Sequence, residues 1–217
     1  MTDVRPLVDG DIRRAAQLHR EVLHMEFLPR FGPAFMETYY RAWSSTAGSI
    51  ALVATSEEND LLGVLLGATN PPVHFKAMVR HDGLRIGTRM IAYAMVHPPL
   101  AKELVVTRSR RYMRGVLRLV RTRFDGEKHA AAHDVGPVVG EITHVLVNPS
   151  VQRGGIGRAL IDAAVDVAKN AGVRELMLVT PPELDAKHFY EQLGWRAEGS
   201  MESQSGERFL RYRLVIP

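Results

Sequence analysis

The feature that most constrains the fold is a glycine-rich turn at residues 152–158 (QRGGIGR), placed between a β-rich run and a helix-forming run. Glycines let the backbone approach a ligand closely, and the first N–H groups of the following helix have no partner within it. A pyrophosphate fits such a helix start, where the helix dipole adds positive charge. Arg153 and Arg158 add charge nearby. We therefore interpret this turn as a phosphate cradle.

Three nucleotide-binding motifs compete for this turn. A P-loop needs Gly-Lys followed by Ser or Thr, whereas the sequence reads Gly157-Arg158-Ala159. A dinucleotide-binding loop expects an acidic residue at the end of the next strand, but that run ends in Thr180. Coenzyme A is the third option. The alternative without a ligand is a tight strand–helix turn.

The periodicity of the rest of the chain predicts a mixed α/β architecture of the α+β type. Period-2 and buried apolar runs predict strands at 4–7, 50–55, 61–69, 141–147, 175–180, 195–200 and 208–215. Apolar residues at helical spacing predict helices at 12–22, 33–43, 156–170 and 185–193. We expect one domain over residues 1–217.

Residues 73–125 have a different character and are predicted to be a helical, basic insertion. Short and longer helices are expected at 88–96 and 100–121. Residues 70–128 hold thirteen Lys and Arg against four Asp and Glu. The longer helix carries one basic face, formed by Arg111, Arg114, Arg118 and Arg121. That face is interpreted either as a solvated or dimer-facing surface or as a functional basic surface.

Composition excludes several classes of protein. The 217 residues are 46% hydrophobic and 24% charged, as in ordinary globular proteins. Zero cysteines exclude disulfides, thiolate metal sites and a cysteine nucleophile, and no metal is expected. No run is apolar enough for a membrane span, and the first residues lack the core of a secretory signal. We expect a cytoplasmic protein.

The sequence resembles the Gcn5-related N-acetyltransferases, the GNAT family. Its signature, Gln/Arg-x-x-Gly-x-Gly/Ala after a strand, is matched by Gln152, Gly155 and Gly157. A later family pattern appears as Ala186, Phe189, Tyr190, Leu193 and Gly194, with Trp195 in place of Phe. The resemblance is strong over 140–200 and less specific over 4–69. It implies the GNAT fold, a mixed central sheet whose central strands splay apart.

The resemblance implies acetyl-CoA as the acyl donor. Its pantetheine arm would lie along the strand 141–147 like an added strand, and strand 175–180 would splay away to leave room. The N–H of Val145 would stabilise the oxyanion that develops on the thioester carbonyl. The residues expected to bind the cofactor are Val145, Leu146, Val147, Gln152, Arg153, Gly154, Gly155, Ile156, Gly157 and Arg158.

Glu141 is the candidate base, because the acceptor must lose a proton before it attacks. It lies eleven residues before Gln152, the separation that histone-modifying relatives use. The alternative is a carboxylate that caps an exposed strand end. Strand alternation predicts that Glu141, Thr143, Val145 and Val147 share one face, with His144 on the other as a packed or paired histidine.

Tyr190 is the candidate acid that would protonate the departing thiolate. The alternative is that Phe189 and Tyr190 are ordinary core residues of a short amphipathic helix. By analogy with the family, Phe27, Phe31 and Tyr39 are candidate acceptor-binding residues. Aromatic residues on a helix face are, in the alternative, part of the core.

The sequence therefore predicts an acetyl-CoA-dependent N-acetyltransferase that acts on a small-molecule or protein amine by direct attack. The alternative is a weakly catalytic or non-catalytic CoA-binding fold whose basic insert binds a membrane, a nucleic acid or a protein. An amine acceptor is the expected partner. A homodimer is an option, as is contact of the insert with a membrane surface or an acidic carrier. Nucleic acid is the least favoured partner.

Overall fold

The computed structural model describes residues 2–104, 138–182, 186–202 and 208–217. Its centre is a seven-stranded sheet in the order β1-β2-β3-β4-β5-β7-β6. Neighbouring strands are antiparallel except β4 and β5, which are parallel. The strands are β1 (Asp3–Pro6), β2 (Ser49–Thr55), β3 (Leu61–Ala68), β4 (Val139–Val147), β5 (Glu175–Thr180), β6 (Arg196–Glu202) and β7 (Arg208–Val215). This confirms the predicted mixed sheet.

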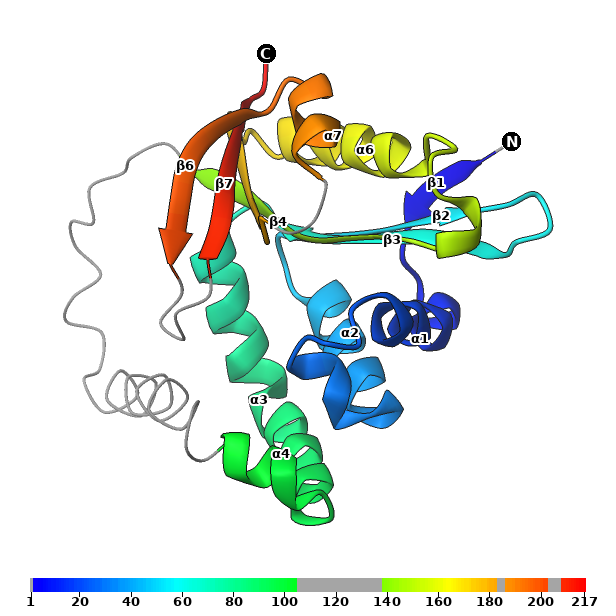
Figure 1. Cartoon of the computed structure of the whole chain (residues 1–217), viewed down its shortest axis with the longest axis vertical. Coiled ribbons are helices and arrows are strands. Elements are labelled where there is room, and N and C mark those ends of the chain that lie inside the picture. The colour runs from blue at the N-terminus through cyan, green and yellow to red at the C-terminus, as the bar shows by residue number, and fades with distance from the viewer. Residues whose placement is uncertain (1, 105–137, 183–185, 203–207) are drawn as a thin grey trace.

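One face of the sheet is covered by α6 (Ile156–Asn170), with α7 (Lys187–Gln192) beside it (Figure 1). Apolar residues of α6 recur every three or four positions, so they form one stripe that packs on β2, β3 and β4. Together with Trp195 and Tyr212 they form the upper core, named for its place in Figure 1. The buried stripe consists of Ile156, Leu160, Ile161, Ala164 and Ala168.

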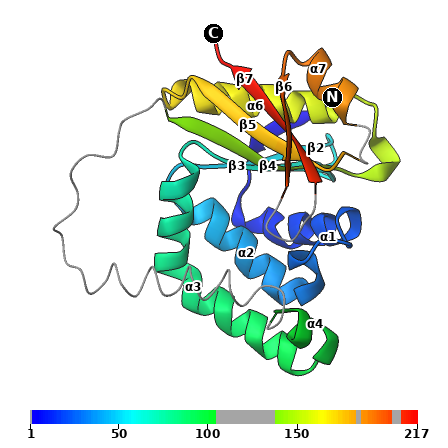
Figure 2. The same ribbon diagram turned by 60° about the vertical axis from the view of Figure 1, so that its left-hand side comes forward.

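The opposite face is covered by α1 (Ile12–Val22), α2 (Pro33–Ser45) and α3 (Pro71–Met95) (Figures 1 and 2). The short α4 (Pro98–Glu103) packs against α3, farther from the sheet. The lower core is built around Trp43, whose side chain is fully buried and whose indole Nε1 donates to the Gly67 carbonyl oxygen at 3.0 Å. Because both faces are covered, β2 and β3 are buried along most of their length.

The helix predicted at 88–96 is the end of a much longer one, because α3 already begins at Pro71. Prolines are tolerated in a first helical turn, and the Asn70 side chain caps this one by accepting from the Val73 N–H at 3.3 Å. The buried side chains of Met78 and Met90 pack in the lower core and hold the helix against it. This packing outweighs the low helix propensity of the two glycines between them.

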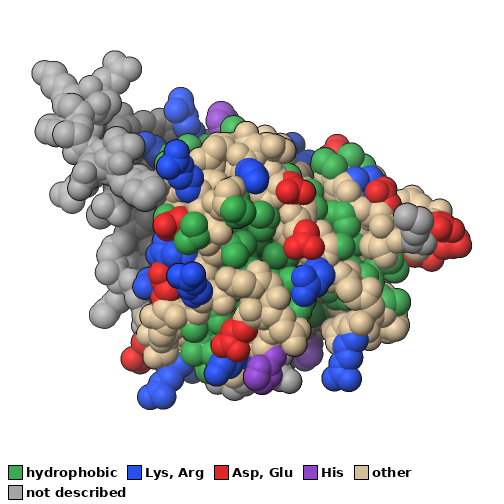
Figure 3. All heavy atoms as spheres, turned by 90° about the horizontal axis from the view of Figure 1, so that it is seen from above, with side chains coloured by type: hydrophobic (Ala, Val, Ile, Leu, Met, Phe, Trp, Pro, Cys, Tyr) green, Lys and Arg blue, Asp and Glu red, His purple; other side chains and the backbone are tan. Residues whose placement is uncertain are grey.

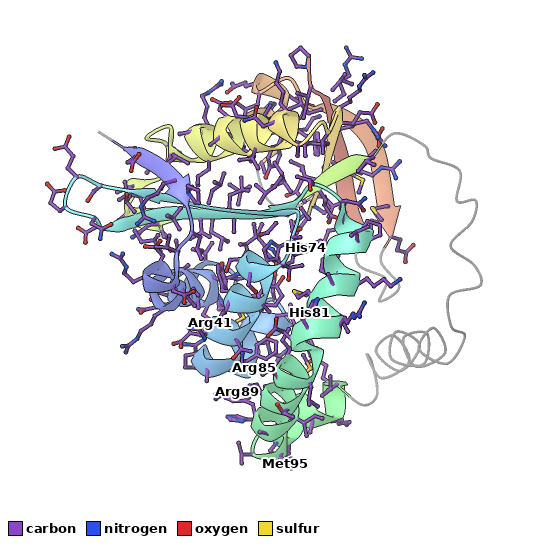
Figure 4. The ribbon with its side chains drawn as sticks, turned by 180° about the vertical axis from the view of Figure 1, so that it is seen from behind. Arg41, His74, His81, Arg85, Arg89 and Met95 are labelled. Atoms are coloured by element: carbon purple, nitrogen blue, oxygen red, sulfur yellow. The ribbon has the colours of Figure 1, made fainter. Side chains whose placement is uncertain are left out.

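The basic character of the predicted insertion is visible on α3. Figure 4 shows His81, Arg85 and Arg89 along this helix and Arg41 on α2, and all four are exposed. Of the helix predicted at 100–121, only its start is described, within α4. The basic face Arg111, Arg114, Arg118 and Arg121 lies outside the described residues, so its role stays a prediction.

Seen from above (Figure 3), acidic and basic side chains are intermixed over the described surface, with hydrophobic side chains between them. Within the part of the chain that the structure describes, no helix is both long and apolar enough to cross a membrane.

Candidate active site

The candidate site lies where β4 parts from β5. The two strands pair from Val139 opposite Glu175 to Ile142 opposite Leu178. Beyond that point β4 runs on to Val147, paired only with β3 among the described strands. The splay that the resemblance implied is therefore confirmed. It leaves the edge of β4 open to an extended ligand.

A β-bulge lies at this parting. In the β3–β4 ladder Leu66 is opposite His144, whereas the next residue, Gly67, is opposite Ile142. Thr143 is thus an extra residue without a partner across the ladder. A bulge of this kind reverses which face the following side chains occupy.

The bulge overturns the predicted separation of Glu141 and His144. Ile142 packs into the upper core, whereas Leu146 packs into the lower core. By alternation on either side of the bulge, Glu141 and His144 both face the lower helices. The prediction was wrong because uninterrupted alternation was assumed, and a bulge depends on pairing with a distant strand. For the same reason Val145 and Val147 face the upper core instead of sharing a face with Glu141.

Glu141 lies in an environment that suits a base. Its side chain is largely removed from water, and this burial raises the pKa of the carboxyl group above its ordinary value. The charge of His144 partly opposes that increase. A raised pKa makes a carboxylate a better proton acceptor near neutral pH. Whether Glu141 is the base stays a prediction.

His19, Glu26 and His144 form a cluster on this same face of β4. The His19 and His144 rings are 4.6 Å apart between centroids, and His144 Nε2 lies 3.6 Å from Glu26 Oε2. The predicted packed or paired role of His144 is confirmed. Burial, together with the charge of His144, lowers the pKa of His19 to about 2, so the His19 imidazole is neutral at physiological pH.

The Tyr40 hydroxyl lies within hydrogen-bond distance of His19, 3.0 Å from its Nδ1 atom, and so orients the His19 ring. Two nitrogens remain unsatisfied: His19 Nε2 and His144 Nδ1 are buried without a hydrogen-bond partner among the described residues. Sequence reasoning missed the cluster because its members come from α1, the loop after it and β4. The only sequence signal was a histidine on the apolar side of a predicted helix.

The glycine cradle has the backbone that the sequence predicted. After β4 a short 3-10 helix (Pro149–Val151) turns the chain, and α6 begins at Ile156. Gly155 is left-handed at φ 81°, and a Cβ there would meet nothing within 4 Å. The space above it is therefore open. No side chain caps this helix start, so its first N–H groups face outward for a ligand.

Gly157 has a packing role in the cradle. A Cβ on Gly157 would come within 3.2 Å of the Phe189 ring and 3.7 Å of Val147. Gly157 thus lets α6 approach the end of β4 and α7. Gln152 also contacts the strand end, since its side-chain Nε2 lies 3.5 Å from the Val147 carbonyl oxygen. The predicted cofactor residues are brought together around one turn, although their contact with a cofactor stays a prediction.

Tyr190 lies on α7 inside the upper core. Its ring packs against Phe189, Trp195 and Tyr212, with centroid separations of 5.1, 6.0 and 5.7 Å. Burial and the nearby Tyr212 raise the pKa of Tyr190 to about 12. The phenol therefore keeps its proton at neutral pH, as an acid must. Its predicted role as proton donor is untested.

The three predicted acceptor-binding aromatics, Phe27, Phe31 and Tyr39, lie in the lower core. Phe31 is 1% exposed and packs against both Phe27 and Phe35. Phe27 and Tyr39 are each 6% exposed. This burial favours a packing role, and contact with an acceptor stays a prediction.

A family comparison supports the resemblance seen in the sequence. Residues 115–195 match the sequence model of the acetyltransferase (GNAT) family. No curated protein matches the sequence significantly.

Solved structures extend the likeness to the whole fold. The protein yncA from Salmonella typhimurium, solved with its cofactor acetyl-CoA, is 14% identical with a TM-score of 0.60. The match covers 100% of this chain and 94% of yncA. The ribosomal-protein-S18-alanine N-acetyltransferase from Escherichia coli is also 14% identical, with a TM-score of 0.55 and the same coverages. Spermidine/spermine N-acetyltransferase SpeG from Vibrio cholerae is 15% identical, with a TM-score of 0.56 and coverages of 99% and 95%.

The chain therefore shares the mixed-sheet fold of the structures just described. Its resemblance to the GNAT family is confirmed, by the match over residues 115–195 and by the shared fold.

Proposed function

We propose that the chain transfers an acetyl group from acetyl-CoA to a primary amine. The observation that carries this proposal is the open edge of β4 beside the uncapped, glycine-rich start of α6. An extended arm can add to the strand edge while a pyrophosphate meets helix N–H groups. The acetyl-CoA bound in the Salmonella typhimurium structure supports the choice of donor.

On the acceptor side, Glu141 takes the proton of the incoming ammonium group. Its burial raises the pKa of the carboxyl group, which brings it closer to the pH at which the reaction runs. The neutral amine then attacks the thioester carbonyl directly, and its nitrogen releases a second proton to solvent as the C–S bond breaks and the amide forms. The Val145 N–H stabilises the oxyanion that develops there.

On the donor side, the Tyr190 hydroxyl gives its proton to the thiolate that leaves. The proton is restored from solvent, so the residue returns to its starting state. The Tyr190 hydroxyl carries its proton at neutral pH, because burial raises its pKa to about 12.

The first test is whether acetyl-CoA stabilises the fold. At 100 times its Kd, a ligand that binds only the folded state stabilises it by about 2.7 kcal/mol. For a chain of this size that corresponds to an increase of Tm by about 5–10 °C. No shift at saturating acetyl-CoA would remove the proposed donor.

Two glycines that flank α6 provide a matched pair of variants for this test. Gly155 and Gly172 are both exposed, both left-handed at φ 81° and 76°, and a Cβ would meet nothing within 4 Å at either. Leucine at either position should therefore cost similar backbone strain, about 1–2 kcal/mol. Only Gly155→Leu, at the cradle, should abolish the stabilisation by acetyl-CoA. Equal ligand shifts in the two variants would place the donor elsewhere.

The second test is a screen of amines with acetyl-CoA that measures the release of free thiol. The chain contains no cysteine, so the protein adds no signal of its own. Acetylated product, identified by mass spectrometry, should appear in step with thiol. Thiol release without acetylated amine would indicate thioester hydrolysis and contradict amine transfer.

A further inference from the structure

The cluster of His19, Glu26 and His144 has the donor set of a metal site. Each residue offers one ligand atom, and these atoms all lie within 4.8 Å of one another. Three tetrahedral nitrogen and oxygen ligands about 2.0–2.2 Å from one Zn²⁺ ion stand about 3.3–3.6 Å apart. Glu26 Oε2 is already 3.6 Å from His144 Nε2. Its side chain also has room to adjust, because it is 46% exposed and lies on the loop after α1.

The buried member of the cluster has a nitrogen that needs a partner. His19 is fully buried, and its Nε2 has no hydrogen-bond partner among the described residues. Leaving a buried polar atom unsatisfied costs about 1–3 kcal/mol. A metal ion would accept the Nε2 lone pair and remove that cost.

Tyr40 prepares His19 for this role from the other side. Its hydroxyl lies 3.0 Å from His19 Nδ1. When Nδ1–H donates to Tyr40, the lone pair is on Nε2 and points away from that contact. A hydrogen bond on the second nitrogen is how proteins commonly orient histidines that bind metals.

We propose that His19, His144 and Glu26 bind one Zn²⁺-class divalent ion beside the β4 bulge. Two imidazoles and one carboxylate favour Zn²⁺, Co²⁺ or Ni²⁺ over Mg²⁺ and Ca²⁺, which prefer all-oxygen sites. Three protein ligands leave a fourth position open to water or to another donor. The bulge is decisive, because without it His144 would face the upper core.

The ion has a consequence for acetyl transfer, and this part of the inference rests on the proposed function. The site lies on the same face of β4 as Glu141, whose pKa responds to His144. A bound cation there would repel the incoming ammonium group. It would also weaken Glu141 as a base, because a nearby positive charge disfavours protonation of the carboxylate. Zn²⁺ should therefore inhibit the transferase.

Cobalt spectroscopy on the full chain tests the site without any activity assay. After treatment with a chelator, titration with CoCl₂ should produce the visible d–d bands of tetrahedral Co²⁺, saturating at one ion per chain, and ZnCl₂ should remove them. Glu26→Gln and His144→Gln should each weaken Co²⁺ binding at least about tenfold. The matched control is His24→Gln, because His24 is exposed and only two residues from Glu26; it should leave the bands unchanged.

Absent bands in the parent protein, an unchanged Co²⁺ affinity in either ligand variant, or a loss of affinity in His24→Gln would overturn the site. If His144→Gln does not fold, the exposed Glu26→Gln still decides. In the thiol-release assay Zn²⁺ should inhibit the parent and spare Glu26→Gln. Failure of the proposed function would show as no transfer in any protein, while the cobalt bands would still report the metal.

Discussion

One extra residue in β4 decides which side chains lie beside Glu141. The extra residue Thr143 reverses the alternation of β4 and brings His144 to the face of Glu141. Burial then raises the pKa of Glu141 while the charge of His144 opposes the increase. One extra residue in a strand thus sets which charged group lies beside the candidate base, while burial is the larger influence on its pKa.

Turnover should depend on pH through Glu141. A base must be deprotonated, so kcat should rise with pH through the raised pKa of this carboxyl group, at a midpoint above the ordinary value of 4.5. Glu141→Gln should lower kcat by about 10²–10⁴-fold and remove that inflection. The measurement is kcat against pH with one amine; any inflection left in the variant belongs to the amine or to other groups. An unchanged profile would exclude Glu141 as the base.

Tyr190 and Tyr212 provide a matched test of the acid. Their rings pack together in the upper core, but the Tyr212 hydroxyl is buried without a hydrogen-bond partner among the described residues. Tyr190→Phe should lower kcat by about 10²-fold and leave the Kd for acetyl-CoA unchanged. Tyr212→Phe should leave kcat unchanged and raise the unfolding free energy by about 1 kcal/mol, because it deletes an unsatisfied group. Equal kcat values for both variants would exclude Tyr190 as the acid.

At the scale of elements, Asp11 joins β1 to the start of α1. Its carboxylate accepts from Arg5 Nη1 at 2.6 Å, Arg5 Nη2 at 3.0 Å and the Val8 N–H at 3.1 Å. The Asp11 side chain is only 2% exposed. The Arg5 hydrogen bonds are the main cause that holds the pKa of Asp11 below its ordinary value, although burial acts in the opposite direction.

Asp11→Asn should lower the free energy of unfolding by about 1.5–3 kcal/mol at pH 7, because it removes hydrogen bonds to a charged group. A lowered pKa means that this contribution is complete above the ordinary value of 3.8 and is lost as pH falls through the folded-state pKa. Urea unfolding at pH 7 and at pH 3 should therefore show a smaller difference from the parent at the lower pH.

The control for this prediction is Asp9→Asn, since Asp9 lies in the same turn but is exposed. Asp9→Asn should change the free energy of unfolding by no more than about 0.5 kcal/mol. A loss as large as that of Asp11→Asn would show that charge at the turn matters, and not the buried contacts of Asp11.

The whole molecule is two cores that share one sheet. The chain has two tryptophans, and each core contains one: Trp43 in the lower core and Trp195 in the upper core. Both are 2% exposed or less. Each tryptophan is therefore a fluorescent reporter of one face of the sheet.

The two cores should unfold together, because β2, β3 and β4 supply residues to both. Trp43→Phe leaves a reporter in the upper core and Trp195→Phe leaves one in the lower core. In each variant, the urea midpoint from fluorescence should coincide with the midpoint from far-UV circular dichroism. A separate transition in either variant would show that the two faces unfold independently.

Much of the architecture was predictable because it depends on neighbours in the sequence. The bounds of α6, β5 and β7 match the predicted ranges, since apolar periodicity and flanking glycine or proline residues are local signals. The long α3 was not predicted, because the packing of Met78 and Met90 outweighs the local propensity of its glycines. Of the site, the cradle was predictable and the histidine cluster was not.

The sequence by itself determined the glycine cradle, the order of the strands and helices around it and the choice of Glu141 and Tyr190 as candidates. Only the tertiary structure decided that Glu141 and His144 share a face and that His19 and Glu26 join them. The physical reason is that a bulge is set by the pairing of β4 with β3. The cluster also needs α1 packed against that strand, and no local pattern in the chain encodes either contact.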